Sequence, residues 1–310
     1  MGYTAWQYIP FIFKVSILFI GTLPINNIKK ALGGIYMFKS ILENLNSKTP
    51  LVHNITNYVT VNDCANILLA CGGSPIMADD INEVKDITSI CNSLVINIGT
   101  LNERTIKSMV AAGRKSNELN HPVVLDPVGA GASGFRTKTT FALLNEVSFA
   151  VIRGNISEIK TVDAGSGTTK GVDANIQDAI TEENLTDSIE FAKKLSKEIG
   201  SIIAITGAID IVANPEKAYV IRNGHATMSK ITGTGCMLTS IIGAFCAANV
   251  DNILDATVTA VCAMGVCGEL AYEKIIENSG GTSSLKMHLI DYMSKINEDL
   301  LKERAKIEVR

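Results

Sequence analysis

The sequence has few charged and few aromatic side chains, and its net charge is small. Charged residues make up 19% of the 310 residues, aromatic residues 5%, and the formal net charge is -3. The charged fraction lies below the roughly 25% of an average soluble domain, which fits a large core and further surface buried between subunits. No basic stripe is present, and this argues against a nucleic-acid partner.

Disulfide and metal-binding motifs are also missing. The seven cysteines form no CxxC pair, and most lie in apolar periodic segments, where a reduced thiol behaves as a small hydrophobic group. This pattern is typical of a reducing compartment and predicts a cytoplasmic protein. The four histidines show no HExxH or related spacing, which argues against a structural zinc site.

The apolar stretch near the N-terminus does not have the pattern of a membrane anchor. Lys14 divides it, and the run that follows is about ten residues, below the roughly 18 needed to span a bilayer. A signal peptide would need a basic segment before it and a small-residue cleavage motif. We therefore expect residues 1–36 to be an extension, for example from an upstream start codon. Residues 37–310 are expected to form a single domain that opens at Met37 with a short amphipathic helix.

From residue 50 onward, short β-rich runs alternate with segments of helical periodicity, which predicts βαβ units in an α/β fold with a mainly parallel central sheet flanked by helices. The predicted strands cover 73–78, 93–99, 122–129, 149–155 and 200–207, with an antiparallel pair at 210–213 and 217–224. The predicted helices cover 80–91, 102–120 (capped by Asn102), 235–248, 253–275 and 285–303, and residues 162–184 are expected to form a surface loop. The segment "TAVCAMGVCGELA" is apolar on every face but too short and glycine-rich for a membrane span, so we expect it in the core or a subunit interface.

Several residues with chemical potential lie at or just beyond the carboxyl ends of the predicted strands. In open α/β sheets ligands bind at that edge, so these residues are expected to share one site. They are Met77, Gly99, Asp126, Arg153, Thr206 and the turn over residues 233–236.

Two acidic residues follow neighbouring strands. Asp126 ends an apolar strand before Pro127, and Glu158 lies near the start of the next helix. Such a pair can hold Mg²⁺ directly or through water, because Mg²⁺ takes one or two carboxylates and keeps several waters. The alternative is that Asp126 forms a turn and Glu158 favours the helix dipole.

The neighbouring polar residues also allow two interpretations. Arg153 can offer its planar set of donors to phosphate oxygens or form a surface salt bridge. Thr206 can bind a nucleotide phosphate or end a strand. Asn54, Asn57 and Asn62 lie in an amide-rich stretch and can bind a neutral ligand or satisfy extended backbone. Met77 can form the apolar wall of a small-ring site or fill the core.

The stretch "ITGTGCMLTS" places a glycine-rich turn directly before an apolar helix. Free backbone N–H groups and the helix dipole at such a point suit a phosphate or a developing anion. Both would also lower the pKa of Cys236 and favour its thiolate. We rank the roles of Cys236 as general base or orienting group first, small packed residue second and covalent nucleophile third, since no histidine is placed by the sequence to activate it.

These residues together resemble hydroxyethylthiazole kinase, a ribokinase-like family of thiamine salvage. The matching stretches run in order between about residues 39 and 303: "VHNITNYVTVNDCAN", "GGSPIMADD", "LVINIGTL", "VVLDPVGAGAS", "VIRGNISEI", "AITGAID" and "ITGTGCMLTS". Seven separate motifs make the resemblance specific. The extension over residues 1–36 and the length of the 162–184 loop depart from the family pattern.

The resemblance implies a three-layer α/β/α fold, a homotrimer with its site near a subunit interface, and ATP- and Mg²⁺-dependent phosphorylation of the alcohol of 4-methyl-5-(2-hydroxyethyl)thiazole. It also implies a role for each matching residue. Cys236 stands for the catalytic cysteine that replaces the aspartate of other ribokinase-like enzymes; Met77, Gly233 and Asn57 contact the thiazole; Arg153 and Thr206 bind ATP; Asp126 and Glu158 place Mg²⁺.

Two alternatives remain at this stage. Another ribokinase-like small-alcohol kinase, such as one acting on the pyrimidine half of thiamine, or an ADP-dependent hydratase-type relative, would carry aspartate at position 236. A thiazole-binding module without catalysis would not transfer phosphate from ATP.

Overall fold

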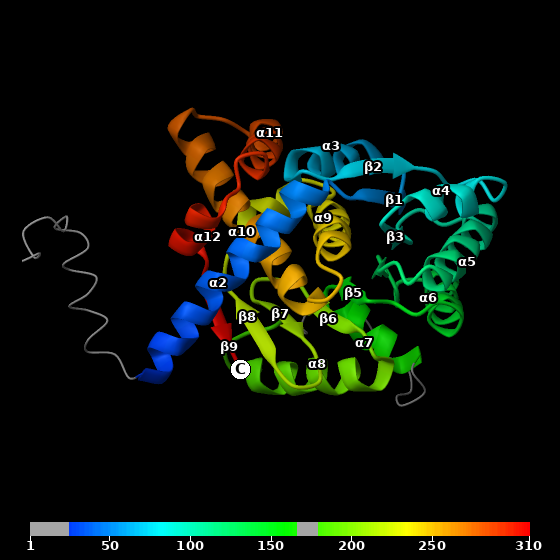
Figure 1. Cartoon of the computed structure of the whole chain (residues 1–310), viewed down its shortest axis with the longest axis horizontal. Coiled ribbons are helices and arrows are strands. Elements are labelled where there is room, and N and C mark those ends of the chain that lie inside the picture. The colour runs from blue at the N-terminus through cyan, green and yellow to red at the C-terminus, as the bar shows by residue number, and fades with distance from the viewer. Residues whose placement is uncertain (1–24, 166–178) are drawn as a thin grey trace, which may run out of the picture.

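The computed structural model describes residues 25–165 and 179–310 (Figure 1). Within these residues, nine strands form one sheet in the order β2-β1-β3-β4-β5-β6-β7-β8-β9. The first six of this order are parallel, and β7, β8 and β9 continue the sheet in antiparallel fashion. Their bounds are β1 Leu51–Ile55, β2 Ser74–Met77, β3 Ser93–Asn97, β4 Val123–Asp126, β5 Val151–Gly154, β6 Ile202–Ile205, β7 Asp210–Ala213, β8 Ala218–Ile221 and β9 Ile307–Val309.

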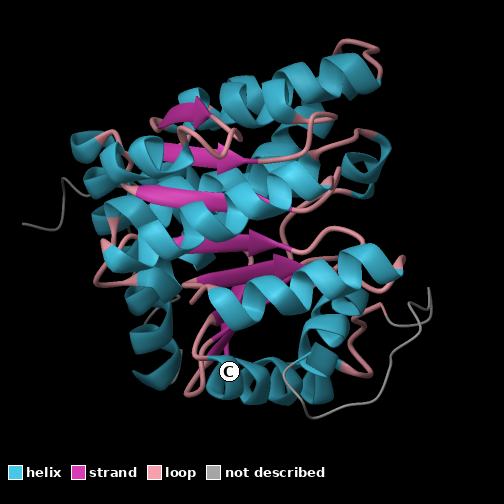
Figure 2. Cartoon of the chain, turned by 90° about the vertical axis from the view of Figure 1, so that its right-hand side faces the viewer, coloured by secondary structure: helices cyan, strands magenta, loops and turns pink. Residues whose placement is uncertain are grey.

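Helices cover both faces of the sheet, which gives three layers (Figure 2). One face carries α9 (Thr234–Ala248) and α10 (Ile253–Glu277), with α2 (Ile25–Lys48), α3 (Val61–Cys71), α11 (Thr282–Met293) and α12 (Glu298–Arg304) packed around them. The other face carries α4 (Val84–Ile90), α5 (Glu103–Glu118), α6 (Gly134–Glu146), α7 (Ile156–Gly165) and α8 (Leu185–Ile199). The predicted mainly parallel α/β architecture is confirmed.

Alternating side chains of the central strands explain why both faces need a helical layer. In β3, Val95 packs into the core under α9, whereas Leu94 and Ile96 pack into the core under α5. In β4, Val124 and Leu125 divide in the same way. A strand that is apolar in both directions is stable only when it is covered on both sides, as in parallel sheets generally.

By length and composition alone, the helix α10 could cross a membrane. The sequence analysis had judged only its thirteen-residue segment "TAVCAMGVCGELA", which is too short to do so. The most apolar window of α10 is 83% buried inside the chain, however, against α9, α11 and the sheet. A core helix of a globular domain has this pattern. The expectation that the segment lies in the core is therefore confirmed.

The predicted strands and helices agree with the structure in kind, but the helices α3, α6 and α8 were not predicted, and three further details differ. Residues 285–303 form α11 and α12 rather than one helix, because Asn297 accepts a hydrogen bond from the Leu300 N–H (2.9 Å) and starts a new helix. The sequence analysis left β1 as an extended segment and missed β9. The expected loop at 162–184 includes the end of α7, and its residues 166–178 lie outside the described part of the chain.

The proposed domain start coincides with the middle of a helix. The helix α2 begins at Ile25, before Met37, and Met37 and Phe38 are both buried against the α9 side of the core. The division into residues 1–36 and 37–310 stays a prediction.

Candidate active site

The predicted site residues gather at the carboxyl edge of the sheet, where the N-terminus of α9 approaches β3 to β6. Register places Asn97 at the end of β3 beside Asp126 at the end of β4. Two adjoining cavities open at this edge and share Arg153, Thr206 and Gly235. We call the one of about 370 Å³ the cysteine cavity, because Cys236, Asn57 and Glu158 line it. The other, of about 540 Å³, is lined by His225 and Asp210 and is called the histidine cavity.

Asp126 is fully buried at the base of the cysteine cavity. Its Oδ2 accepts hydrogen bonds from Asn97 Nδ2 (2.9 Å) and Thr239 Oγ1 (2.8 Å), and Arg153 Nη1 lies 3.7 Å away. Among the described residues, Oδ1 has no hydrogen-bond partner. Burial raises the pKa of Asp126 to about 6, with the Arg153 charge opposing this and the Glu158 charge adding to it. A buried carboxylate with one open oxygen is suited to a cation.

Glu158 performs the local structural role and lines the cavity at the same time. Its backbone N–H donates to Asn155 Oδ1 (2.9 Å) and its Oε2 accepts from the Asn155 N–H (2.8 Å), a reciprocal cap at the start of α7. Its Oε1 accepts from the Gly129 N–H (2.9 Å). Within the described residues no group of three or more His, Cys, Asp or Glu side chains is placed to hold a metal. Asp126 and Glu158 both line the cysteine cavity, and one or two carboxylates of this kind suit Mg²⁺ that keeps most of its water.

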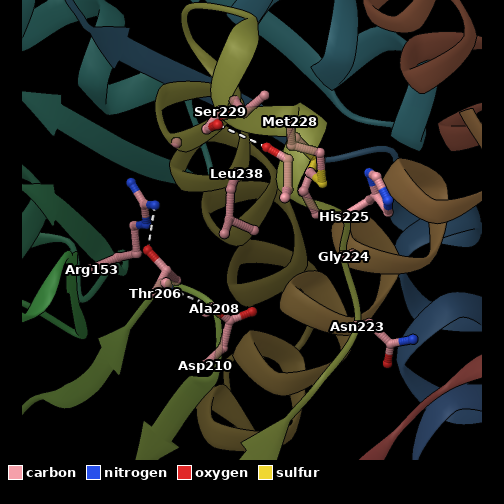
Figure 3. A pocket seen from close by; sticks show the side chains of 16 residues that line it. Arg153, Thr206, Ala208, Asp210, Asn223, Gly224, His225, Met228, Ser229 and Leu238 are labelled. Carbon is pink, nitrogen blue, oxygen red and sulfur yellow. Dashed lines mark hydrogen bonds between the residues drawn. The ribbon is translucent and has the colours of Figure 1, made fainter. Parts of the chain in front are cut away.

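Arg153 lies inside the protein and links the two cavities. Its Nη2 donates to Thr206 Oγ1 across the ends of β5 and β6 (Figure 3), and its side chain is 13% exposed. A Cβ added to Gly235 would lie 2.5 Å from Arg153 Nη1, so the guanidinium packs directly on the backbone at the start of α9. The alternative of a surface salt bridge is wrong. The guanidinium stands where phosphate oxygens at the helix N-terminus would also meet it.

The sulfur of Cys236 accepts two amide hydrogen bonds, from Asn57 Nδ2 (3.1 Å) and Asn97 Nδ2 (3.3 Å). The predicted lowering of its pKa is wrong. Burial raises the pKa of Cys236 and the nearby Asp126 charge raises it further, whereas hydrogen bonds from Thr60, Asn57 and Asn97 act in the opposite direction. Burial and the Asp126 charge therefore favour the neutral thiol.

The glycine-rich turn has the conformation that the sequence suggested. Gly233 has φ +92°, and α9 begins at the next residue. A Cβ at Gly233 would lie 2.7 Å from Thr60 Cγ2, so both backbone conformation and space require glycine there. His225 belongs to the histidine cavity, where its ring stacks on Tyr272 with 3.5 Å between the centroids. It does not line the cysteine cavity.

Some predicted residues lie away from the two cavities. Met77 ends β2, the edge strand, is half-buried and lines neither cavity. Asn54 is buried and its Oδ1 accepts from Ser240 Oγ (3.0 Å), and Asn62 accepts from Asn66 Nδ2 (3.0 Å), so both have structural partners. Gly99 lines the cysteine cavity as expected. A thiazole contact by Met77 stays a prediction.

Three residues of the site were missed by the sequence analysis. Asn97 interrupts the apolar run "SLVIN", Thr239 follows Cys236 by about one helical turn, and Asp210 opens the strand "DIVA". Asp210 Oδ1 accepts from the Gly207 N–H (2.8 Å), and burial raises the pKa of Asp210 to about 7, which its hydrogen bond and the Arg153 charge counteract. A polar residue inside an otherwise apolar run was the available signal for Asn97 and Asp210.

The fold resembles that of known small-molecule kinases. A ribokinase-like superfamily protein from Enterococcus faecalis superimposes with a TM-score of 0.55 over 82% of this chain and 88% of its own, at 13% identity. The structure of hydroxyethylthiazole kinase protein from Pyrococcus horikoshii superimposes with a TM-score of 0.79 over 89% of this chain and 99% of its own, at 34% identity. The fold and the site together define a ribokinase-like phosphotransferase.

The sequence comparisons give the family. Residues 42–299 match the hydroxyethylthiazole kinase family. A protein named hydroxyethylthiazole kinase from Clostridium acetobutylicum is 59% identical over 272 residues, which cover 88% of this chain and 99% of the relative. The chain belongs to the hydroxyethylthiazole kinase family, as the motifs suggested.

Proposed function

We propose that the protein transfers the γ-phosphoryl group of ATP to the hydroxyl of 4-methyl-5-(2-hydroxyethyl)thiazole, a step of thiamine salvage. One observation carries this proposal within the family. Cys236 is the one of the seven cysteines, all of which lie in the described residues, that is not buried. It stands at the N-terminus of α9 beside Asp126 and Arg153, where the two cavities meet. One cavity is then available to each substrate, with the reacting atoms between them.

Each substrate is assigned to one of the two cavities. The histidine cavity takes ATP, so that the γ-phosphoryl group reaches Arg153 and Thr206. The N–H groups at the start of α9 and the Arg153 guanidinium stabilise the charge on the transferring phosphoryl. The thiazole enters the cysteine cavity beside Asn57 and Gly233, with its hydroxyl at Cys236. The contact predicted for Met77 would lie outside this cavity, at the end of β2.

Magnesium fits the residues present. Asp126 with its open Oδ1, together with Glu158, would hold Mg²⁺ largely through water, and the ion would supply charge neutralisation of the phosphates. Asn97 and Thr239 both donate to Asp126 Oδ2, so Oδ1 is the oxygen without a partner among the described residues.

Assembly and location form part of the same proposal. We infer a homotrimer in the cytoplasm, with a neighbouring subunit close to the cysteine cavity. Two exposed apolar residues directly after Asn57 support a subunit contact near the cysteine cavity. Tyr58 is 77% exposed and Val59 is 58% exposed. Large apolar side chains at the mouth of a site commonly mark a surface that another chain covers.

The test is product formation by the purified protein with ATP, Mg²⁺ and the hydroxyethylthiazole. We expect one ADP per thiazole phosphate, with the product identified by mass spectrometry. The matched control is 4,5-dimethylthiazole, which keeps the ring but lacks the hydroxyl and should give no ADP above background. Equal ADP release with both compounds, or with the thiazole omitted, would show that the acceptor is another molecule.

A further inference from the structure

Among the residues that the structure describes, Asn97 is the buried side chain with hydrogen bonds to both Asp126 and Cys236. It is 1% exposed, and its Nδ2 donates to Asp126 Oδ2 (2.9 Å) and to Cys236 Sγ (3.3 Å). Its Oδ1 accepts from the Gly99 N–H (2.9 Å) and from Asn57 Nδ2 (3.0 Å). Both N–H groups and both oxygen lone pairs of this amide therefore have protein partners, and none is left to bind a ligand in the cavity.

The orientation of the Asn97 amide is determined by its surroundings. The Gly99 N–H can only donate, so it requires the oxygen of Asn97 on its side. A reversed amide would bring N–H against N–H there, and oxygen against the Asp126 carboxylate on the other side. The NH₂ group of Asn97 must therefore face Asp126 and the sulfur.

The second amide on the sulfur is fixed in the same manner. The Thr60 N–H and the Thr60 hydroxyl both donate to Asn57 Oδ1, at 3.1 and 3.0 Å. Asn57 Nδ2 is thus left to Asn97 Oδ1 and Cys236 Sγ. Two amides, each with its orientation dictated by a backbone N–H, present donors to one sulfur.

We infer that Asn97 is a positioning residue that fixes the Cys236 sulfur as a hydrogen-bond acceptor and joins it to the Asp126 carboxylate. The thiol hydrogen is then turned away from both amides, toward Thr60 and the cavity. The same donors stabilise the sulfur when it carries negative charge, against burial and the Asp126 charge. The inference rests on the proposed function in one respect, namely that Cys236 takes part in the reaction.

Asn97 also explains how a change at one reactive group reaches the other. Its two N–H bonds diverge from a single planar amide, so the sulfur and Asp126 Oδ2 cannot move independently. Thr239 provides the comparison, because it donates to Asp126 Oδ2 (2.8 Å) and to Gly235 O (3.1 Å) without a recorded contact to the sulfur. The variant Thr239→Val therefore removes a donor from Asp126 alone.

The first test needs no catalysis. Iodoacetamide alkylation of Cys236, followed by mass spectrometry, is measured against pH; the other six cysteines are buried. The titratable groups near the sulfur are Asp126 and Cys64; the neighbouring Asn57 and Asn97 amides do not titrate. Loss of a hydrogen bond to a charged group should raise the half-maximal pH by about one unit in Asn97→Ala. Thr239→Val should stay near the wild type.

The shorter Asn97→Ser is a second variant in case Asn97→Ala does not fold, since a hydroxyl can still accept from Gly99 but is one bond too short to replace both donors. It should raise the half-maximal pH as well. Greater exposure of the thiol would lower the half-maximal pH instead, because burial is the main cause of the raised pKa of Cys236. An unchanged half-maximal pH in the folded Asn97 variants would overturn the inference, and so would an equal rise in Thr239→Val, because the effect would then pass through Asp126.

The second test is a double-mutant cycle on turnover. Asn97→Ala should lower kcat about tenfold in the wild-type background. In the Cys236→Ala background its cost should shrink to that of Thr239→Val. An undiminished tenfold loss without the thiol would contradict a link through Cys236. Absence of kinase activity in the wild type would refute the proposed function instead, and the alkylation result would stand apart from it.

Discussion

The two adjoining cavities are lined by different kinds of groups, although they share Arg153, Thr206 and Gly235. In the cysteine cavity the polar groups are side chains that bond to one another, as Asn57, Asn97 and Asp126 do. In the histidine cavity a large part of the lining is backbone and apolar side chains, including Gly224, Leu238 and Met228 (Figure 3). Side chains locked by their neighbours position reacting atoms, whereas a backbone and apolar surface binds without taking part in chemistry.

The difference extends to the buried aspartate of each cavity. Asp126 and Asp210 are both buried and both have a raised pKa. Asp210 Oδ1 accepts from the Gly207 N–H and supports the turn between β6 and β7. Asp126 keeps one oxygen without a partner in the described part of the chain. The Asp210 carboxyl thus supports a turn at the histidine cavity, whereas the Asp126 carboxyl keeps a buried oxygen without a partner.

Arg153 belongs to both cavities, so its removal should have the largest effect. Arg153→Met keeps much of the side-chain volume but removes the charge beside Asp126 and the donor to Thr206. We expect kcat to fall by about 10³-fold, the scale of a donor that stabilises transferring charge. Thr206→Val, which removes only the partner, should cost far less. Comparable losses in both variants would show that Arg153 acts only through Thr206.

Cys236→Ala should damage the chemistry of one cavity while leaving the other intact. We expect kcat about 10²-fold lower, the lower end for a positioned proton-transfer group, with the KM for ATP nearly unchanged. The variant should keep some activity because Arg153 and the α9 N-terminus remain. An unchanged kcat would mean that the thiol only fills space. Complete loss of activity, together with a thiol-linked intermediate in the wild type, would indicate a covalent nucleophile.

Asp126→Asn should change metal dependence more than substrate binding. An amide keeps the shape but removes the charge that faces the open side of the cavity, so the Mg²⁺ concentration for half-maximal rate should rise about tenfold. Glu158→Gln should shift it in the same direction. The concentration is found by Mg²⁺ titration at saturating substrates. An unchanged requirement in both variants would place the ion elsewhere.

Asp210→Asn should change the pH dependence of stability. Because burial raises the folded-state pKa of Asp210 to about 7, the group stabilises the fold fully at pH below its unfolded pKa. That contribution is lost as pH rises through about 7. The amide does not titrate, so the Tm of the variant relative to the wild type should rise between pH 5 and pH 8, by a few degrees. Thermal melts at the two pH values give the comparison, and a constant difference would contradict it.

Sequence reasoning identified the layers of the fold because apolar runs and helical periodicity are local. It missed β9, three residues at the C-terminal end, because so short a strand has no periodicity of its own. At the site it found Asp126, Glu158, Arg153 and Cys236, which lie at strand or helix ends. Asn97 escaped notice, since its importance depends on partners brought together by register.

The wrong direction for the Cys236 pKa has the same origin. A helix N-terminus is visible in sequence, and it favours a thiolate. Burial and the Asp126 charge are visible only in three dimensions, and they dominate. Local sequence therefore predicted the place of the thiol but not its protonation.

The most direct test of the account is the turnover of Cys236→Asp at saturating ATP. Asn57 and Asn97 present two N–H donors to position 236, and such donors suit a carboxylate as well as a sulfur. If Cys236 orients the substrate hydroxyl or accepts its proton, the aspartate variant should retain turnover well above that of Cys236→Ala. Turnover as low as that of the alanine variant would contradict an orienting or proton-accepting role for Cys236.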